Sequence, residues 1–418
     1  MRDFFLPRGS ALLLGSVLMA SGAIGCTGID SSSADIVDTP NSAVERQSIG
    51  NCWIYAESSW VEAMHLAATG EEFDNSQSYW TYWHWYDQVV GGATEISTGG
   101  GENVARQIIL KRGLVSEKDF IAEDALAEMS GRQKSALARI GVELKGGRLM
   151  TAAARKNKKL VRQVLDDAWE LTPPVRKYLD KAFGTTGTKT FLTTASATGT
   201  PIIRSRDFAV RYTERVTNPN KGTQKDTALK TALDEWSTED YPSWGTSTDK
   251  RSFQIRVQKA MHDHNPVMIT WMVDFNAMES SDPKLNGSFN MTTLGRASGP
   301  GHQGGHMTVL EDYQAKTKDF GVLAAGVTLD PSKPEDQKKL DAALLPTTEI
   351  QFFRIKNSWG AFRDDRASAP GFPGFHDLYL DYLNGPITWC PDVEGAKDKT
   401  NCTGEANPWE NVILPPGY

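Results

Sequence analysis

A cysteine stands where a glycine-led turn gives way to an amphipathic helix, and this placement constrains the chain more than any other feature of its sequence. The segment 47–56 reads QSIGNCWIYA, and apolar residues then recur at helical spacing as far as Gly70, a typical helix stop. Free amide groups at a helix N-terminus favour a thiolate and lower the pKa of the thiol. Cys52 is therefore a candidate nucleophile, although a small cysteine at this position could equally be a packing residue.

A cysteine nucleophile needs a base, and the base needs a group that orients its ring. The segment 304–310 reads GGHMTVL, which places His306 after a flexible glycine pair at the mouth of a predicted strand. The segment 352–360 reads FFRIKNSWG, a second predicted strand that ends on Asn357 and Trp359. Cys52, His306 and Asn357 thus supply the three roles.

These motifs, in this order, resemble the papain family of cysteine peptidases, and the bleomycin hydrolase branch is the nearer likeness. Further matching segments are SQSYWTYW at 76–83, GGGEN at 99–103, RGLVSE at 112–117, RVQKAM at 256–261 and NPVMITW at 265–271. The resemblance covers about 47–117 and 252–385. It implies an α+β, two-lobed fold in which a helical lobe carries the nucleophile and an antiparallel, β-barrel-like lobe carries the histidine and the asparagine.

By this resemblance, Cys52 attacks a peptide carbonyl and forms a thioester acyl-enzyme. His306 acts first in an ion pair with the thiolate and then as the acid that protonates the leaving amine. Asn357 accepts a hydrogen bond from the imidazole, and Trp359 shields that bond from water. The resemblance therefore implies a cysteine-type peptidase, which we expect to need no cofactor and no metal.

The resemblance also implies how substrate and oxyanion are held. Gly100 and Gly101 match glycines along which an extended peptide can hydrogen-bond to the backbone. The oxyanion lies between the Cys52 backbone N–H and the side-chain amide of Gln47. Gln47 stands five positions before Cys52, whereas the family's glutamine usually stands six before, where this chain has Arg46. A tighter turn, the backbone donor alone, or a contribution from Arg46 are the alternatives.

The N-terminus predicts export. Arg2 and Arg8 precede the apolar run ALLLGSVLMA at 11–20, which is typical of a signal peptide over 1–25. The segment SGAIGC at 21–26 resembles a bacterial lipobox, which makes Cys26 a candidate lipidation site. Ordinary cleavage near Ala23 is the alternative. Residues 26–45 read as a tether, too short for an inhibitory propeptide, and Thr27 suggests an outer-membrane lipoprotein; otherwise the protein is secreted.

Cys390 and Cys402 remain after Cys26 and Cys52 have been assigned. They close a short loop rich in Pro, Gly, Asp and Lys. An oxidising compartment permits a disulfide there, which would fix the tail over 390–418. A metal pair or two free thiols are alternatives, but no further ligands stand nearby in the sequence.

Between the helical lobe at 46–117 and the β lobe at 251–389 lies an insertion, 118–250, that we predict to be mainly helical. Its helices are expected through 126–144, 149–171 and 175–183, and the remainder is rich in Thr, Gly and Lys. The basic run 155–159 is predicted to be a solvated helical face. The insertion could restrict the cleft to peptide ends or short peptides, bind a partner, or stabilise the domain.

Composition and two other patterns narrow the function further. A net charge of −7 argues against a nucleic-acid partner and leaves peptides or proteins as the substrate. His302 and His306 have the spacing of a zinc peptidase, but Gln303 replaces the required glutamate and a glycine pair spoils the helix. The aromatic run 79–86 could be a carbohydrate platform, but its spacing favours a core helix.

The same three catalytic groups serve more than one function. They could pass the acyl group to an amine, which would make the protein a transpeptidase or peptide ligase. An inactive protein that binds peptides at the cell surface is the other alternative. We favour hydrolysis, with structural or solvent-facing roles for the other histidines, which are His65, His84, His262, His264 and His376.

Overall fold

The computed structural model describes residues 42–189, 199–363, 365–390, 402 and 404–418. The predicted signal peptide, Cys26 and most of the predicted tether lie outside the described residues. Within them, no helix combines the length and apolar composition that crossing a membrane requires.

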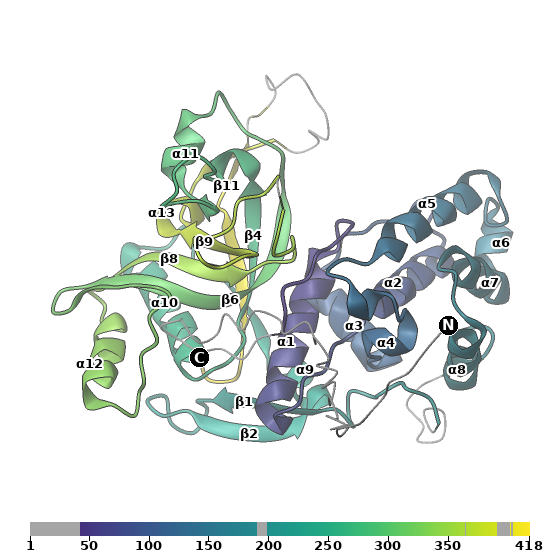
Figure 1. Ribbon diagram of the computed structural model, residues 1–418, viewed down its shortest axis with the longest axis horizontal. Coiled ribbons are helices and arrows are strands. Elements are labelled where there is room, and N and C mark those ends of the chain that lie inside the picture. The colour runs from purple at the N-terminus through teal and green to yellow at the C-terminus, as the bar shows by residue number, and fades with distance from the viewer. Residues whose placement is uncertain (1–41, 190–198, 364, 391–401, 403) are drawn as a thin grey trace, which may run out of the picture.

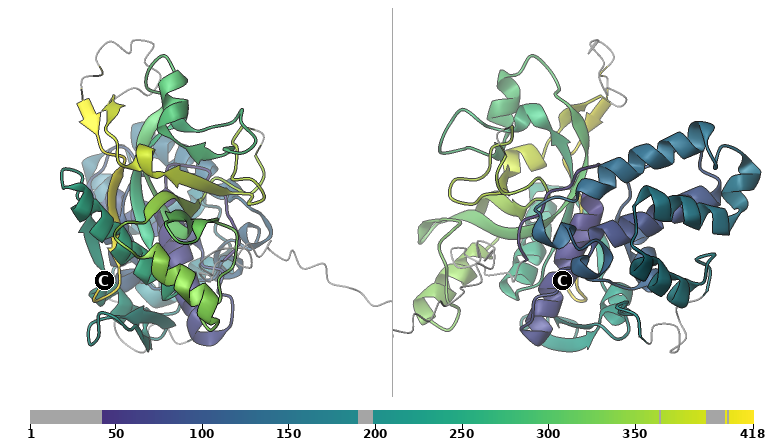
Figure 2. Two further views of the ribbon diagram at one scale, coloured as in Figure 1. Left: turned by 90° about the vertical axis from the view of Figure 1, so that its left-hand side faces the viewer. Right: turned by 45° about the vertical axis from the view of Figure 1, so that its right-hand side comes forward.

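One half of the molecule is helical, and it includes the cysteine-bearing helix α1 (Cys52–Thr69) (Figure 1). Figure 1 shows α1 between the sheet and the other helices of this half, and the right-hand view of Figure 2 shows the same order. The other helices are α2 (Gln77–Gly91), α3 (Glu102–Arg112), α4 (Glu117–Phe120), α5 (Gly131–Gly146), α6 (Ala152–Lys156), α7 (Lys158–Ala168) and α8 (Pro173–Phe183), with a short 3-10 turn at Asp124–Leu126.

The other half is built on an eight-stranded sheet with the order β3-β12-β4-β6-β8-β9-β5, and β7 pairs with β6. All pairings are antiparallel except β5 with β9. The strands are β3 (Ser237–Asp240), β4 (Met268–Asp274), β5 (Ser288–Phe289), β6 (Gln303–Thr317), β7 (Gly321–Leu323), β8 (Glu349–Lys356), β9 (Phe375–Tyr379) and β12 (Trp409–Leu414). Its helices are α10 (Ser247–His262), α11 (Met291–Arg296), α12 (Pro334–Ala343) and α13 (Leu380–Leu383), with a 3-10 turn at Phe275–Ala277. The predicted α+β division is confirmed.

Helix α1 begins and ends where the sequence predicts. Gly70 adopts φ 72°, a left-handed conformation that glycine reaches without strain, and its N–H closes the helix on the Leu66 carbonyl. Every residue from Trp53 to Met64 is buried, because α1 packs against β1 and β6 on one side and α2 and α3 on the other. The helix is therefore a central element and not a one-sided amphipathic helix.

Helix α2 carries the aromatic run and packs it into the core. Ser76 caps the helix by accepting a hydrogen bond from the Tyr79 N–H. The side chains of Tyr79, Trp80, Tyr82 and Trp83 are at most 1% exposed. The core interpretation is confirmed, and a carbohydrate platform on these rings is excluded by their burial.

The segment 118–250 contains the predicted helices and also strands that its sequence did not indicate. The helix expected over 149–171 is broken at Asn157, whose side chain caps α7 by accepting from the Leu160 N–H. Arg155, predicted to be solvated, is buried and donates to the carbonyls of Leu149 and Met150. The remaining elements are the hairpin β1 (Ala209–Glu214) and β2 (Thr223–Ala228), the helix α9 (Leu229–Glu235), and β3, which belongs to the main sheet.

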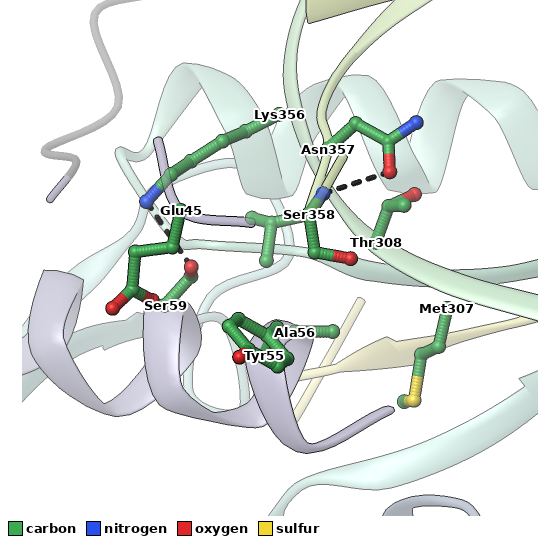
Figure 3. A pocket seen from close by; sticks show the side chains of 10 residues that line it. Glu45, Tyr55, Ala56, Ser59, Met307, Thr308, Lys356, Asn357 and Ser358 are labelled. Carbon is green, nitrogen blue, oxygen red and sulfur yellow. Dashed lines mark hydrogen bonds between the residues drawn. The ribbon is translucent and has the colours of Figure 1, made fainter. Parts of the chain in front are cut away.

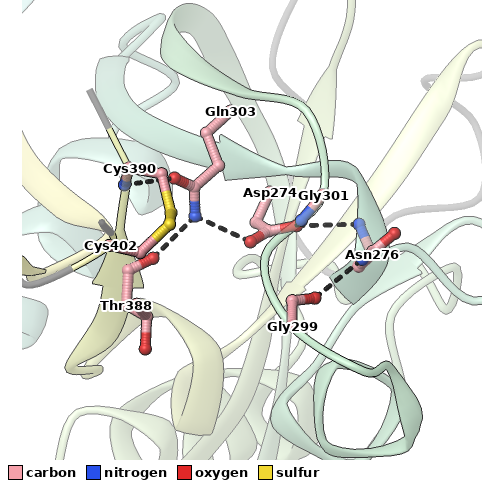
Figure 4. Close-up of a disulfide and its surroundings, with 8 residues drawn as sticks. All are labelled: Asp274, Asn276, Gly299, Gly301, Gln303, Thr388, Cys390 and Cys402. Carbon is pink, nitrogen blue, oxygen red and sulfur yellow. Dashed lines mark hydrogen bonds between the residues drawn. A yellow bond between two sulfur atoms is a disulfide. The ribbon is translucent and has the colours of Figure 1, made fainter. Parts of the chain in front are cut away.

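The predicted disulfide between Cys390 and Cys402 is present (Figure 4). It flanks the small ladder of β10 (Ile387–Trp389) and β11 (Gly404–Ala406). Gln303, at the start of β6, accepts from the Cys390 N–H at 2.9 Å and donates to Asp274 at 2.7 Å. The disulfide therefore fixes the segment at Cys390, which is hydrogen-bonded to the first residue of β6, the strand that carries His306.

A buried lysine joins the two halves of the molecule. The Lys356 side chain leaves the end of β8 and reaches α1, where Nζ donates to Ser59 Oγ at 3.1 Å and to Ser42 Oγ at 2.7 Å (Figure 3). Burial lowers the pKa of Lys356, and the nearby carboxyls of Glu62 and Glu45 oppose that shift. A cavity of about 10 Å³, about the space one water needs, lies among these residues.

The acidic side of this cluster holds more carboxyls than cations. Oxygen atoms of Glu45, Asp74 and Glu117 lie within 4.8 Å of one another, close enough to hold a metal ion. Burial and the neighbouring acids raise the pKa of Glu117 to about 10, and burial raises that of Glu62 to about 7. Protonation of these carboxyls therefore relieves the repulsion among them.

The Glu62 carboxyl should make stability depend on pH. Its pKa lies above the ordinary 4.5, so the folded state holds a proton that the unfolded chain releases, and this stabilisation fades as the pH rises from about 4.5 to about 7. Glu62→Gln keeps an oxygen acceptor for the Ser58 hydroxyl and the Asn75 N–H but cannot ionise. We expect urea unfolding to show that the free energy of unfolding of the variant, relative to the wild type, increases by on the order of 1 kcal/mol per pH unit across this window. A difference independent of pH would contradict the assignment.

Candidate active site

The turn before α1 places Cys52 at the first position of the helix. The preceding side chain, Asn51, is buried and donates to Thr81 Oγ1 at 3.1 Å and to Gln133 Oε1 at 3.0 Å, so α2 and α5 both hold the turn. Cys52 is a free thiol and is half-buried. Backbone amides of Cys52, Trp53 and Met307 lie close enough to favour its thiolate.

Burial nevertheless raises the pKa of the Cys52 thiol above its ordinary value. The sequence predicted a lowered pKa from the helix N-terminus alone. That prediction is wrong in its net direction, because removing the sulfur from water costs the anion more than the amide groups return. The resting site therefore holds a thiol.

His306 and Asn357 form the predicted pair. Nε2 of His306 and Oδ1 of Asn357 are 2.8 Å apart, and both side chains are buried. Asn357 Oδ1 also accepts from the Ser358 N–H at 2.8 Å, which fixes the amide so that its oxygen faces the ring. Because that oxygen only accepts, Nε2 carries the proton and Nδ1 of the neutral ring is free to act as a base.

Aromatic rings enclose this imidazole. The ring of Trp359 stacks on His306 with centroids 4.8 Å apart and 21° between the planes, and Trp271 meets it edge-on at 5.6 Å. Burial lowers the pKa of His306 to about 4, the Asn357 hydrogen bond opposes this shift, and the charge of Arg366 adds to it. The imidazole is therefore neutral over the physiological range.

The fold brings the cysteine and the histidine to one place. Helix α1 packs against β6, and the Met307 amide that faces the Cys52 sulfur belongs to the residue next to His306. Asn357 follows directly on β8, the strand that pairs with β6. Three segments far apart in the sequence thus meet at the contact between α1 and the sheet.

Gln47 lies against the same strand end. Its Oε1 accepts from Ser358 Oγ at 2.6 Å, its backbone N–H donates to the Ser358 carbonyl at 2.9 Å, and its Nε2 donates to the Ile49 carbonyl at 2.8 Å. An amide nitrogen has two hydrogens, so one remains for a ligand. The shorter spacing therefore brings the Gln47 side chain to Ser358, the residue after Asn357, and its oxyanion role stays a prediction.

The glycine loop packs on the residue after the nucleophile. The Trp53 indole N–H donates to the Thr98 carbonyl at 3.0 Å. A Cβ on Gly100 would lie 2.5 Å from the Trp53 ring, so this position admits no side chain without displacement. Gly101 has no neighbour within 4 Å of such a Cβ and caps α3. The two predicted substrate glycines thus differ. Packing against Trp53 requires a glycine at position 100, whereas a side chain would find open space at position 101.

The remaining histidines do not form a metal site with His306. His302 is exposed and stacks on Phe275, while His306 lies on a strand and bonds to Asn357, so the arrangement expected of a zinc peptidase is absent from the described residues. His262 bonds to the Tyr313 hydroxyl and His376 to the Gly287 carbonyl.

Sequence reasoning missed Arg366. Its guanidinium lies over the Phe275 ring at 3.9 Å and the Trp359 ring at 4.9 Å. It stands in a loop without a recognisable motif. The signal in the sequence that could have pointed to Arg366 is its position shortly after the Asn-Ser-Trp-Gly segment at 357–360.

No protein-family model matches the chain, and a search of curated proteins found no match. Among solved structures, it is similar to PepW from Lactobacillus rhamnosis HN001 (12% identity, covering 92% of this chain and 81% of that one, TM-score 0.41). It is also similar to xylellain, a cysteine protease from Xylella fastidiosa (13%, 92% and 85%, 0.36), and to bromelain from Ananas comosus in complex with the E64 inhibitor (12%, 90% and 94%, 0.32). These identities and TM-scores are low, so we base the function on the geometry of the site.

The two glycines offer a matched test of the loop. Gly100→Ser should cost about 1–3 kcal/mol of unfolding free energy, because its side chain collides with Trp53. Gly101→Ser should be close to neutral, because the position is open and serine is a good helix N-cap. Denaturant unfolding of both proteins measures the difference, and equal effects would contradict the packing described.

Proposed function

We propose that the protein is an exported cysteine peptidase that hydrolyses peptide bonds through Cys52, His306 and Asn357. The observation that carries the proposal is the orientation of His306. Its Nε2 donates to Asn357 Oδ1 at 2.8 Å, which leaves Nδ1 to act as the base. The next residue, Met307, points its backbone amide at the Cys52 sulfur, so the imidazole belongs to the chain neighbour of a residue that faces the nucleophile. A neutral base held in one tautomer beside a thiol is what nucleophilic cysteine catalysis requires.

The reaction proceeds through proton transfers at Nδ1 of His306. As the Cys52 sulfur attacks the substrate carbonyl, its proton passes to Nδ1, and the carbonyl oxygen becomes an oxyanion. His306 then gives the proton to the leaving nitrogen, the carbon–nitrogen bond breaks and a thioester remains. Water, deprotonated by His306, attacks the thioester, and the returning proton restores the Cys52 thiol as the acid product leaves.

We propose two donors for the oxyanion. The Cys52 backbone N–H stands at the helix N-terminus, and the unused Nε2 hydrogen of Gln47 lies beside the same turn. Loss of one such donor commonly lowers kcat by about 100- to 1000-fold. The buried environment strengthens both hydrogen bonds, since water does not compete for the developing charge.

The motifs support placement nearest the bleomycin hydrolase branch of the papain family, and the N-terminal sequence supports export. We propose cleavage of a signal peptide over 1–25, lipidation at Cys26 and attachment to a bacterial outer membrane. The disulfide between Cys390 and Cys402 agrees with an oxidising compartment. Peptides or proteins are the proposed substrates.

Product analysis separates hydrolysis from acyl transfer and from binding alone. A reporter peptide library incubated with the protein should give shorter peptides with free carboxyl ends by mass spectrometry. Added amine should not divert all of the product into ligated peptide. Ligated product alone would indicate a transpeptidase, and no product would favour a peptide-binding protein.

Cys52→Ala should lower turnover by on the order of a millionfold, because no other group can form the thioester. Circular dichroism and melting should match the wild type, since the side chain is small and makes no structural bond. An epoxide-type thiol trap provides the control: it should label Cys52 in the wild type and leave Cys390 and Cys402 unlabelled. Retained turnover in Cys52→Ala would remove this residue from the site.

The pH profile should report the imidazole. We expect kcat/KM to fall as the pH drops through about 4, where protonated His306 no longer accepts the thiol proton. The Asn357 hydrogen bond raises the pKa of His306, so Asn357→Ala should move this acid limb to lower pH. Asn357→Asp places a negative charge at the ring and should move it to higher pH. Shifts in the same direction would contradict the assigned pair.

A further inference from the structure

The loop that follows Trp359 borders a cavity of about 430 Å³, a size typical of small-ligand pockets. The described part of its lining includes two arginines and no carboxylate. The lining residues are Asn286 and residues 361–363 and 366–373. A cavity with this lining favours an anionic group over a cationic one.

The two arginines differ in what already holds them. Arg363 donates to both carboxylate oxygens of Asp365, with Nε at 2.7 Å, so its charge is largely compensated. Arg366 is held by the faces of Phe275 and Trp359 instead, and its buried Nε has no hydrogen-bond partner among the described residues. Stacking fixes the guanidinium plane while leaving its edge free for hydrogen bonds.

The other described acids near this loop already accept hydrogen bonds. The Glu128 carboxylate accepts from the Ala361 N–H, and Asp365 pairs with Arg363. Asp274 accepts from the Gly301 N–H at 2.9 Å and from Gln303 at 2.7 Å. The charge of Asp365 also acts on Arg366, but no described carboxylate accepts a hydrogen bond from this guanidinium, which therefore has capacity for a new carboxylate.

Arg366 stands on the leaving side of the reaction. The Trp359 ring that it covers stacks on His306 at 4.8 Å. His306 must protonate the leaving nitrogen, so the substrate residues that follow the scissile bond lie next to this imidazole. The glycine loop packs instead on Trp53, beside the nucleophile that keeps the acyl half.

We propose that Arg366 binds a substrate carboxylate located just after the scissile bond, in the cavity lined by residues 361–363 and 366–373. The proposal rests on the proposed function, because the role of His306 defines the leaving side. A guanidinium and a carboxylate form two parallel charge-assisted hydrogen bonds. The carboxylate is either the free C-terminus of a short peptide or the side chain of an acidic residue at that position.

Three capped peptides with one cleavable core test the proposal. The first ends in a free carboxylate one residue after the scissile bond, the second is its amide, and the third is an amide that carries Glu at that residue. We expect kcat/KM for a carboxylate peptide to exceed that of the plain amide by about tenfold or more, mainly through KM. Preference for the first identifies a chain end, and preference for the third identifies an acidic side chain.

Variants assign the preference to one side chain. Arg366→Gln should reduce the carboxylate-to-amide ratio to about one, and Arg366→Lys should retain part of it because the charge remains. Arg363→Gln is the matched control in the same loop and should keep most of the ratio, since Asp365 already engages Arg363. Equal kcat/KM for the three peptides, or a ratio that survives Arg366→Gln, would overturn the proposal.

A binding measurement separates this proposal from the proposed function. Calorimetry with the Cys52→Ala protein requires no turnover, and the same three peptides serve as probes. Tighter binding of a carboxylate peptide that is lost in Cys52→Ala/Arg366→Gln supports the Arg366 site. This holds even if the wild type cleaves none of the peptides, because absence of cleavage rejects only the peptidase activity. Equal binding of all three peptides rejects the Arg366 site even where the wild type cleaves them.

Discussion

The arrangement of the molecule depends on one buried cation. Lys356 is the last residue of β8, directly before Asn357, and its ammonium group crosses to Ser59 of α1 and to Ser42 of the N-terminal segment. This side chain therefore links the strand that leads to Asn357 directly to the helix that carries the nucleophile. A buried ammonium is costly unless hydrogen bonds and opposite charges surround it. The carboxyls of Glu45 and Glu62 oppose the lowering of the Lys356 pKa where they are ionised, but burial raises their own pKa values, so protonation of these acids weakens that support as the pH falls. The attachment is specific because few other positions of the strand and the helix would satisfy all of these groups at once.

Burial also decides where the catalytic protons rest. It raises the pKa of Cys52 and lowers that of His306, so both groups are held in their neutral forms. The local amide groups that favour a thiolate are present, but they do not outweigh the loss of water. A neutral pair costs less to bury than an ion pair, and its polar atoms remain aligned for proton transfer. Charge therefore develops during the reaction, where the Asn357 hydrogen bond and the backbone amides near Cys52 can stabilise it.

Local patterns in the sequence predicted most of the elements that carry the site. The helix from Cys52 to Gly70, the core role of the aromatic helix, the strands bearing His306 and Asn357, and the Cys390–Cys402 disulfide all depend on neighbours in the chain or on simple pairing rules. The strands β2 and β3 were missed because their residues are mostly polar and show no clear alternation of buried and exposed positions. The strand β1 was missed with its hairpin partner β2, and β3 pairs with β12, which lies far away in the sequence. The shifts at Cys52 and the buried state of Lys356 and Arg155 were missed for a related reason. Each depends on the tertiary environment, and a lysine or arginine next to apolar residues reads in a sequence as a solvated charge.

The proposed carboxylate site joins substrate binding to the chemistry through one electrostatic relation. The positive charge of Arg366 contributes to lowering the pKa of His306, which opposes the imidazolium that must form when the ring accepts the Cys52 proton. A carboxylate bound to the guanidinium would compensate that charge, because the pair presents a much smaller net field to the ring. The imidazolium would then form more readily in the complex than in the free protein. A substrate with the carboxylate would thus gain in the transition state as well as in binding, whereas a substrate without it would leave the effect of the Arg366 charge on the ring unchanged. Arg366 therefore has the properties of a specificity residue. Its charge acts on the base, His306, across the Trp359 ring and without any movement of the chain.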